Sequence, residues 1–281
     1  GELMNSRSGT RVKVVRVASR QAKSDVDLGS AQFSTDLDDL LSDPEVDVVV
    51  ELIGGETVAL ELIRQALAAG KGVVTANKAV IAANGNELVM GNSRGRIRFE
   101  AAVAGAIPII QAMQESLVAT RFFGLQGIIN GTCNYILSVM ESEGASFDEV
   151  LAQAQALGYA EAEPSFDVDG IDAAHKLTIL LALGFSGSFD FEALYIEGIR
   201  QITMDDIRYC DEFGYKIKHL GIVKETDQGY EARVHPALVA KSALLAHVSG
   251  VTNAVQLDTD AAAQTLFSGP GAGGLATASA V

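Results

Sequence analysis

The chain has 281 residues, 48% of them hydrophobic, and its 21 Lys and Arg stand against 36 Asp and Glu, for a formal net charge of −15. This length corresponds to about two domains, and its apolar runs are shorter than the roughly 18 residues that a membrane-spanning helix needs. The acidic charge repels phosphate backbones and anionic lipid, so the sequence predicts neither a nucleic-acid partner nor a membrane partner.

The cysteines indicate the cellular compartment, and the chain ends indicate whether the sequence is a fragment. Only Cys133 and Cys210 are present, far apart in the sequence, which excludes a disulfide-stapled scaffold and favours the reducing cytoplasm. The chain starts at Gly1 without an initiator Met and stops at Val281 within a small-residue helical pattern. We expect a fragment whose first strand lies upstream; an intact protein with frayed ends is the alternative.

Strand and helix patterns alternate through residues 1–102. Apolar and β-branched runs predict strands at 12–18, 46–52, 73–76 and 97–101, and helical spacing predicts helices at 36–42, 57–69 and 86–92. This alternation is typical of a parallel sheet with crossover helices. We predict that residues 1–102 form an α/β domain with a truncated Rossmann-type sheet, which binds a dinucleotide.

A different pattern begins after Val103. Helices are predicted at 107–117, 131–140, 146–157 and 171–183, and strands at 122–129, 216–223 and 230–234, the last two as an antiparallel hairpin. Ser146 and Glu149 form a capping box that opens the third helix. Residues 103–268 are therefore predicted to form a second, α+β domain, followed by a glycine-rich segment at 269–281.

The signals for nucleotide binding are indirect. A Gly-x-Gly-x-x-Gly turn normally follows the first strand. The run from Gly269 to Gly274 imitates it, but no βαβ unit follows, so we reject that run as the fingerprint. Arg20 follows the strand at 12–18, where an acidic residue would bind a ribose hydroxyl, and this favours NADP over NAD. A basic surface side chain is the alternative.

Two other strand ends offer contacts to a nucleotide. Gly54 and Gly55 follow the strand at 46–52 and would let a ring or ribose approach the backbone closely. An ordinary turn is the alternative there. Thr75, Asn77 and Lys78 end the next strand and bring an amide and an ammonium to the same edge, although most lysines at such positions are solvated.

The densest cluster of carboxylates runs from Glu161 to Asp172 and ends in a helix. Asp172 and Lys176 are four residues apart and share one face of that helix, where a solvated pair would contribute about 0.3–0.5 kcal/mol. Because the helix continues as a nearly all-apolar segment, Lys176 is instead expected to be partly buried and suited to proton transfer.

Cys133 suggests a rival chemistry. It lies at the start of a predicted helix, where the dipole lowers a thiol's pKa. A thioacylating aldehyde dehydrogenase with Cys133 as nucleophile is therefore an alternative function. A buried structural cysteine is the commoner case.

Seven motifs together resemble the homoserine dehydrogenase family and follow its order along nearly the whole chain. They are VVVELIGG at 48–55, VTANKA at 74–79, EAAV at 100–103, IPII at 107–110, NGTCNYI at 130–136, the segment from GYAE at 158–161 to KL at 176–177, and GPGAG at 269–273. This family reduces L-aspartate 4-semialdehyde to L-homoserine with NAD(P)H, on the pathway to threonine and methionine. The resemblance implies a cytoplasmic oxidoreductase with a small-molecule substrate.

The resemblance also implies roles for individual residues. Lys176 would be the general acid that protonates the carbonyl oxygen, and Asp172 would orient it or bind the substrate hydroxyl. The implied substrate-binding residues are Glu161 and Asp167 for the α-amino group, Thr132 for the carboxylate, and Gly131 and Tyr159. Lys78 would contact cofactor and substrate. The implied cofactor contacts are Lys78, Asn77, Thr75, Gly54, Gly55, Arg20 and Gly273.

The remaining implications concern a cation and the assembly. Sodium would bind the Glu100 carboxylate and the carbonyls of Val103, Gly105 and Ile107, an oxygen set that suits a hard cation. Residues 103–268 would bind substrate and form a homodimer through their sheet, and 269–281 would return to the nucleotide-binding domain. The missing glycine turn departs from the family, so a non-catalytic substrate-binding and dimerisation fragment is a further alternative.

Overall fold

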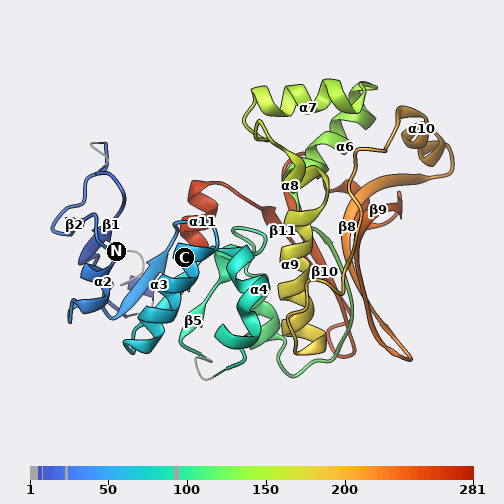
Figure 1. Ribbon diagram of the computed structural model, residues 1–281. Helices are drawn as coiled ribbons and strands as arrows, with labels where there is room; N and C mark the ends of the chain where they lie inside the picture. The colour runs from blue at the N-terminus through green and yellow to red at the C-terminus, as the bar shows by residue number, and fades with distance from the viewer. Residues whose placement is uncertain (1–5, 8, 23–24, 92–94) are drawn as a thin grey trace. The chain divides into compact units, whose positions relative to one another are not determined.

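The computed structural model describes residues 6–7, 9–22, 25–91 and 95–281, apart from the side chain of residue 186. Its contacts divide the chain into two compact units, Gly1–Val74 and Thr75–Val281 (Figure 1). Within the described residues no helix is both long and apolar enough to cross a membrane.

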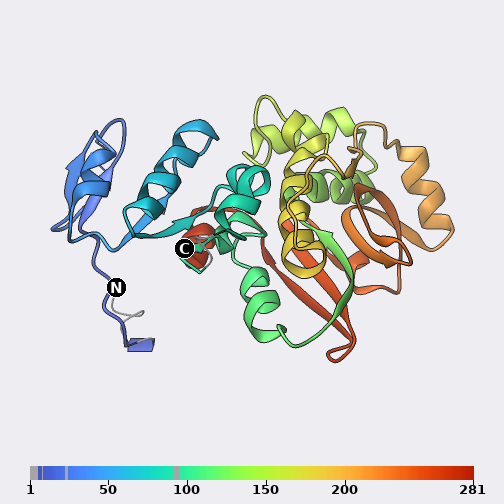
Figure 2. The same cartoon turned by 60° about the horizontal axis from the view of Figure 1, so that its bottom comes forward.

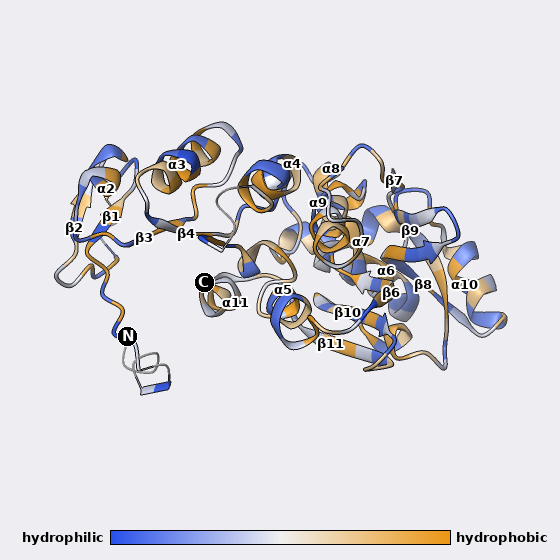
Figure 3. Cartoon of the chain, turned by 90° about the horizontal axis from the view of Figure 1, so that it is seen from below, coloured by the Kyte–Doolittle hydropathy of each residue, from blue (hydrophilic) through white to orange (hydrophobic). Residues whose placement is uncertain are grey.

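Strands and helices alternate in the first unit as the sequence predicts, except that the strand at 32–34, which was not predicted, follows the first strand directly. The elements of this unit are β1 (Arg16–Ala18), β2 (Gln32–Ser34), α2 (Asp38–Ser42), β3 (Val48–Glu51), α3 (Thr57–Ala68) and β4 (Gly72–Thr75), of which the last residue, Thr75, belongs to the second unit. β1 and β2 pair in parallel, and β3 is hydrogen-bonded to β4. Helix α3 is amphipathic, with both orange and blue segments in Figure 3, and it buries Leu62, Ile63 and Ala66. This unit therefore has the predicted α/β character.

The strand predicted at 12–18 is shorter in the structure. Only Arg16–Ala18 is a strand, because β2 offers just three residues as partners. Val12 and Val14 are exposed and lie before it, outside any helix or strand. A β-branched run therefore marked the strand but not its beginning, since a strand is defined by the neighbour that accepts its hydrogen bonds.

The second unit combines a sheet with helices. Its elements are α4 (Lys78–Leu88), β5 (Ile97–Arg98), η1 (Glu100–Ala102), α5 (Ile109–Gln111), η2 (Ala112–Ser116), β6 (Phe122–Ile128), α6 (Gly131–Glu143), α7 (Phe147–Ala156), α8 (Ser165–Val168), α9 (Ile171–Leu181), η3 (Ala182–Ser186), β7 (Tyr195–Ile196), α10 (Met204–Glu212), β8 (Tyr215–Thr226), β9 (Gly229–Ala240), η4 (Leu244–His247), β10 (Thr252–Thr259), β11 (Gln264–Pro270) and α11 (Gly274–Ala280).

Six of these strands form one sheet in the order β11-β10-β6-β8-β9-β7. Its pairs are antiparallel except for the short parallel pair of β7 with β9. Helices α6 and α9 pack on this sheet (Figures 1 and 2). On that face a Cβ added to Gly221 of β8 would lie 3.2 Å from the Leu177 side chain of α9. The glycine thus permits close packing of helix on strand.

The structure corrects two predicted helices. The helix predicted at 86–92 is α4, which begins earlier, at Lys78, because the Asn77 side chain accepts the Val80 N–H as an N-cap. Gly85 lies inside α4, where a side chain would collide with the Phe189 ring. The helix predicted at 107–117 is the short α5, which continues as the π-helical turn η2.

The structure also corrects the C-terminal part. The hairpin predicted at 216–234 is the longer pair β8 and β9, which are in register from Tyr215 to Thr226. The first residues of the segment at 269–281, Gly269 and Pro270, complete strand β11 against β10. The Pro270 carbonyl accepts the Ala106 N–H at 3.0 Å, so the start of this segment packs on the chain between η1 and α5.

Candidate active site

Asp172 on α9 stands between two lysines. Its Oδ2 lies 2.7 Å from Lys176 Nζ on the same helix, and its Oδ1 lies 2.9 Å from Lys78 Nζ at the start of α4. The aspartate is only 3% exposed. The predicted pair of Asp172 and Lys176 is thus one half of a buried Lys–Asp–Lys cluster.

The two ammonium groups control the ionisation of Asp172. Burial by itself would raise the pKa of this carboxyl, but the charges of Lys176 and Lys78 outweigh burial and lower it to about 2. Asp172 is therefore ionised at neutral pH, and it can hold both lysine side chains in fixed positions.

Lys176 is further restrained by the backbone. Its Nζ donates to the Ile129 carbonyl at 2.8 Å, in addition to Asp172, and its side chain is 12% exposed. An ammonium has three N–H donors, so these two contacts leave a third for another acceptor. The following turns of α9, Leu177 and Ile179–Leu181, are buried, which explains how a charged residue is carried into the interior.

A second carboxylate, Asp167 on α8, lies beside this cluster. Asn130 Nδ2 donates to Asp167 Oδ1 at 2.7 Å and to Asp172 Oδ2 at 2.8 Å. Burial and the neighbouring Asp172 charge raise the pKa of Asp167, and the Asn130 amide partly offsets this. Our sequence interpretation missed Asn130, although its position before a helix, where Asn is a preferred N-cap, was a usable signal.

Of the other predicted substrate residues, Thr132 and Tyr159 lie beside Asp167, whereas Glu161 does not. Thr132 Oγ1 donates to the Tyr159 carbonyl at 2.7 Å and lies 3.5 Å from Asp167 Oδ2, which brings these three residues together. A Cβ on Gly131 would lie 3.0 Å from the Val251 carbonyl, so close packing favours glycine there. Glu161 is exposed, and its backbone carbonyl accepts the Gln155 amide. Among the described contacts, its carboxylate does not join the cluster.

Phe166 is a further neighbour that sequence reasoning missed. The Lys78 ammonium lies 5.5 Å from the centroid of its ring, within the range of a cation–π contact. The Phe166 ring also contacts the His175 ring, and the two ring centroids are 5.5 Å apart. No local pattern marks Phe166, because Lys78 reaches it from another helix.

In the first unit, the predicted cofactor residues are all accessible. Arg20 is exposed, and Gly54 and Gly55 are exposed with φ of 74° and 70°, a backbone conformation that favours glycine. No atom lies within 4 Å of a Cβ added to either glycine. Glu51 accepts the N–H groups of Ile53 and Gly54 and so orders this turn after β3. Open backbone at a strand's carboxyl end suits a nucleotide.

In the second unit, the predicted cofactor residues have structural contacts of their own. The Asn77 N–H donates to Thr75 Oγ1 at 2.9 Å, and both residues are buried. The Asn77 side chain caps α4, which leads directly into Lys78. Gly273 precedes α11 with a φ of 113°, again a conformation suited to glycine.

Glu100 and the residues after it form a compact turn. The Glu100 carboxylate accepts the N–H groups of Ile110 and Gln111 at 2.9 and 2.8 Å. Burial raises the pKa of this carboxyl, and these N–H groups partly offset the effect. Ala104 and Gly105 have φ of 56° and 55°. In the same segment the Ile107 carbonyl accepts the Ile109 N–H at 2.8 Å.

Cys133 does not have the properties of a nucleophile. It is 0% exposed, and burial, followed by the charges of Asp167 and Asp172, raises the pKa of its thiol well above the usual value. Its Sγ donates to the Asp167 carbonyl at 3.2 Å. The expectation of a lowered pKa at the helix start is wrong here, because desolvation and nearby anions exceed the effect of the dipole.

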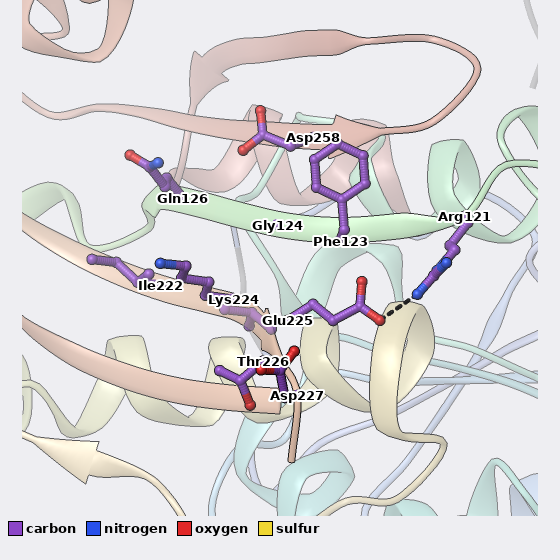
Figure 4. A pocket seen from close by; sticks show the side chains of 11 residues that line it. Arg121, Phe123, Gly124, Gln126, Ile222, Lys224, Glu225, Thr226, Asp227 and Asp258 are labelled. Atoms are coloured by element: carbon purple, nitrogen blue, oxygen red, sulfur yellow. Dashed lines mark hydrogen bonds and ion pairs between the residues drawn. The ribbon is translucent and has the colours of Figure 1, made fainter. Parts of the chain in front are cut away.

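An open groove of about 820 Å³ lies elsewhere on the sheet (Figure 4). Gln126 pairs with Ile222, and Gly124 pairs with both Lys224 and Asp258, so these side chains share one face. The alternate pairs on β6 and β8 face α9 instead, as Gly221 indicates. The groove is therefore on the face opposite α9 and does not include the Lys–Asp–Lys cluster.

Comparison with known proteins defines the class of protein first. Residues 1–100 match the family "Homoserine dehydrogenase, NAD binding domain". The chain is similar to the crystal structure of a homoserine dehydrogenase from Thiobacillus denitrificans, with a TM-score of 0.95 and 51% identity over 99% of this chain and 65% of that one. The fold and the site thus define an α/β protein in which the nucleotide-binding domain contributes Lys78, and a second domain contributes Asp172 and Lys176, to the Lys–Asp–Lys cluster.

The second domain gives the particular family. Residues 108–281 match the family "Homoserine dehydrogenase". A homoserine dehydrogenase of Pseudomonas aeruginosa is 51% identical over 98% of this chain and 64% of its own length. A hyperthermophilic archaeal homoserine dehydrogenase, solved in complex with NADPH, is 29% identical with a TM-score of 0.74, over 89% of this chain and 72% of that one. This chain belongs to the homoserine dehydrogenase family, and it spans less than two thirds of the Pseudomonas and Thiobacillus proteins.

Proposed function

We propose that this chain carries the catalytic centre of an NAD(P)-dependent homoserine dehydrogenase, which interconverts L-aspartate 4-semialdehyde and L-homoserine. The observation that carries the proposal is the Asp172 carboxylate held between Lys78 and Lys176. This cluster offers a fixed ammonium as proton donor in a protein whose family has a nucleotide-binding domain.

A reduced nicotinamide nucleotide, bound by the cofactor residues assigned below, would supply hydride to the aldehyde carbon. Lys176 uses its third N–H to donate a proton to the carbonyl oxygen, which becomes the alcohol hydroxyl. Asp172 holds Lys176 and Lys78 by ion pairs and so orients the donor. Both of its oxygens already accept hydrogen bonds, which favours this role over binding of the substrate hydroxyl. Lys176 regains its proton from solvent, and the balance is one hydride and one proton added.

The substrate's charged ends find complementary groups. Asp167 would accept its α-ammonium group, with Glu161 as a second carboxylate nearby in the sequence. Gly131 and Thr132 open α6, a helix of 13 residues, whose N-terminal N–H groups suit a carboxylate. Tyr159 lies beside Thr132 through its carbonyl. The excess of carboxylates thus serves an amino-acid substrate that is small and cationic at one end.

The residues of each unit fit a nicotinamide nucleotide. In the first unit, Gly54 and Gly55 present bare backbone after β3, and Arg20 provides a cation for a 2′-phosphate. In the second, the assigned residues are Thr75, Asn77, Lys78 and Gly273. We propose NADP as the preferred form and NAD as an alternative. The NADPH complex of the archaeal relative supports this choice.

An absorbance assay of nicotinamide oxidation tests the proposal. The chain is incubated with NADPH or NADH and L-aspartate 4-semialdehyde, and in reverse with L-homoserine. Lys176→Ala should lower kcat by about 100- to 10,000-fold, as expected for loss of a general acid. Lys241→Ala is the control, because this lysine also pairs with an aspartate but lies just after β9, and its partner Asp211 lies on α10. Nucleotide binding without turnover in the folded wild-type chain would favour a substrate-binding and dimerisation fragment.

A sodium site at Glu100 is a separate proposal. The carboxylate and the carbonyls of Val103, Gly105 and Ile107 are hard oxygen ligands within one tight segment, which fits a hard monovalent cation. Such an ion would stabilise the turn that leads into α5. Thermal unfolding in sodium chloride should occur at higher temperature than in choline chloride of equal ionic strength. Glu100→Gln should abolish that difference; an equal difference in the variant would contradict the site.

We also propose a homodimer that forms through the open face of the six-stranded sheet. Phe123 is 43% exposed there, and Lys224 and Asp258 offer opposite charges to a second copy. Residues 103–268 would provide both this interface and the substrate site, and 1–102 the nucleotide-binding domain, with 269–281 returning to it. Sedimentation should give a dimer that Phe123→Asp converts to a monomer.

The two free thiols, Cys133 and Cys210, accord with the cytoplasm as compartment.

A further inference from the structure

Asn130 has a fixed orientation at the start of α6. It is 4% exposed, and its Oδ1 accepts the Cys133 backbone N–H at 2.7 Å as an N-cap. A backbone N–H can only donate, so this contact identifies the oxygen end of the carboxamide. The Nδ2 amino group therefore faces the other way, toward Asp167 and Asp172.

The two N–H groups of this amide reach two different carboxylates. Nδ2 lies 2.7 Å from Asp167 Oδ1 on α8 and 2.8 Å from Asp172 Oδ2 on α9. One side chain thus connects the beginning of α6 with both acidic residues of the site. A carboxylate at position 130 could cap the helix equally well, but it could not donate these bonds.

We propose that Asn130 is a positioning residue that gives the Asp167 and Asp172 carboxylates one N–H each, which fixes their separation and leaves Asp167 able to receive a substrate ammonium group. The inference rests on the proposed function for the identity of that ligand, an α-amino acid. Asn130 itself touches neither reacting atom; it acts through the two aspartates.

The charges of the site explain why this amide matters. Asp167 and Asp172 are like charges in a buried region, and Lys78 and Lys176 bind Asp172 directly. Burial and the Asp172 charge raise the pKa of Asp167, whereas the Asn130 hydrogen bond lowers it. Without the amide, Asp167 should ionise at higher pH, and its affinity for a cationic amino group should fall below that pH.

A role in helix capping alone makes a different prediction. Asn, Asp and Ser are similar N-cap residues, so Asn130→Ser and Asn130→Asp both retain the cap of α6. Asn130→Ser replaces the two N–H donors by a single O–H on a shorter side chain, whereas Asn130→Asp removes both donors and adds a third negative charge. If capping were the whole role, both variants would resemble the wild-type protein.

The test follows the ionisation of Asp167 in the whole chain by carbon NMR of 13C-labelled aspartate, with Asp167→Asn to identify the signal. In Asn130→Ser the pKa of Asp167 should rise by about one unit, the effect of losing a hydrogen bond to a charged group, and in Asn130→Asp by more. Below that pKa, KM for L-homoserine should rise about tenfold, with recovery at higher pH. An unchanged titration of Asp167 in folded Asn130→Ser would overturn the inference.

Asn134 provides a matched control on the same helix. It is 1% exposed, and its amide donates to the carbonyls of Val248, Gly250 and Thr252 rather than to a carboxylate. Asn134→Ser should weaken the fold but leave the Asp167 titration unchanged. An equal shift in this variant would mean that any loss of a buried amide disturbs the site, and the inference would be wrong.

Two further outcomes keep the inference separable from the proposed function. In the wild-type protein, which needs no substitution, the side-chain amide protons of Asn130 should shift with the titration of Asp167; their indifference to it would overturn the inference. A chain that does not turn over the substrate, but whose Asp167 pKa rises in Asn130→Ser, would refute the function and support the positioning role. Turnover together with an unchanged Asp167 titration would do the opposite.

Discussion

The Lys78 ammonium of α4 and the Asp172 carboxylate of α9 form an ion pair of 2.9 Å between two helices that are far apart in the sequence. Lys176 takes the other carboxylate oxygen at 2.7 Å. The same aspartate therefore sets the positions of two cations, one 32% and the other 12% exposed at the side chain. Their different burial suggests different contributions to activity.

Replacing Lys78 should impair the proposed dehydrogenase activity less than replacing Lys176. Lys78→Ala leaves the pair of Lys176 and Asp172 intact and removes one charge-assisted contact, so kcat/KM should fall about 10- to 100-fold. Lys176→Ala removes the proposed proton donor and should lower kcat more. Steady-state kinetics of both variants beside Lys241→Ala decide this order. A larger loss in Lys78→Ala would make Lys78 the better candidate for the acid.

Asp172 should stabilise the folded protein at neutral pH and lose this effect in acid. Its pKa is lowered from the ordinary 3.8 to about 2, so its contribution is present above pH 3.8 and disappears as the pH falls toward 2. The difference corresponds to about 2 kcal/mol in the free energy of unfolding. Urea unfolding measured between pH 6 and pH 2 checks this. The free energy of unfolding should fall less toward pH 2 in Asp172→Asn than in the wild-type protein, because the other carboxyl groups titrate alike in both.

Asp167 supplies a control of opposite sign. Its pKa is raised, so its contribution is present below the ordinary 3.8 and is lost as the pH rises through the folded value. The free energy of unfolding of Asp167→Asn, relative to that of the wild-type protein, should therefore be higher at neutral pH than in acid. The same pH trend in both variants would contradict the assigned electrostatics.

The Cys133 thiol should resist modification in the folded protein. It is fully buried, whereas Cys210 on α10 is partly exposed. In Cys210→Ser, a thiol reagent should react with Cys133 only on unfolding; in Cys133→Ser, Cys210 should react in the native state. With a disulfide reagent that releases a coloured thiolate, the absorbance of that leaving group reports both rates. Rapid native modification of Cys133 with parallel loss of activity would restore the nucleophile hypothesis.

Gly198→Ala should destabilise the segment that carries Asp167. A Cβ at position 198 would lie 2.6 Å from the Asp169 Cα and would also collide with the Val168 carbonyl, both backbone groups just after Asp167. Overpacking of this kind costs about 1–3 kcal/mol, so the thermal midpoint should fall and KM should rise. Gly274→Ala is the control, because nothing lies within 4 Å of a Cβ there. Equal midpoints for the two variants would show that the segment after α8 yields easily.

Features that depend on neighbouring residues in the chain were predicted from the sequence, whereas contacts between distant segments were not. Asp172 and Lys176 were predicted on one helical face because their spacing follows the helical period alone. The seven motifs in order identified the family, which the comparisons confirm. The start of α4 was missed because Asn77 was interpreted as a nucleotide contact, whereas its side chain also caps the helix.

The sequence by itself determined the alternation of strands and helices, the family, and the helix that carries Asp172 and Lys176, since these follow from periodicity and from residue order. Only the tertiary structure decided that Lys78 meets Asp172, that Asn130 joins two carboxylates and that Cys133 is buried beside anions. The physical reason is that these contacts arise from the packing of α4, α6, α8 and α9 against each other and the sheet. Burial and neighbouring charge, which set ionisation, come from that packing rather than from spacing along the chain.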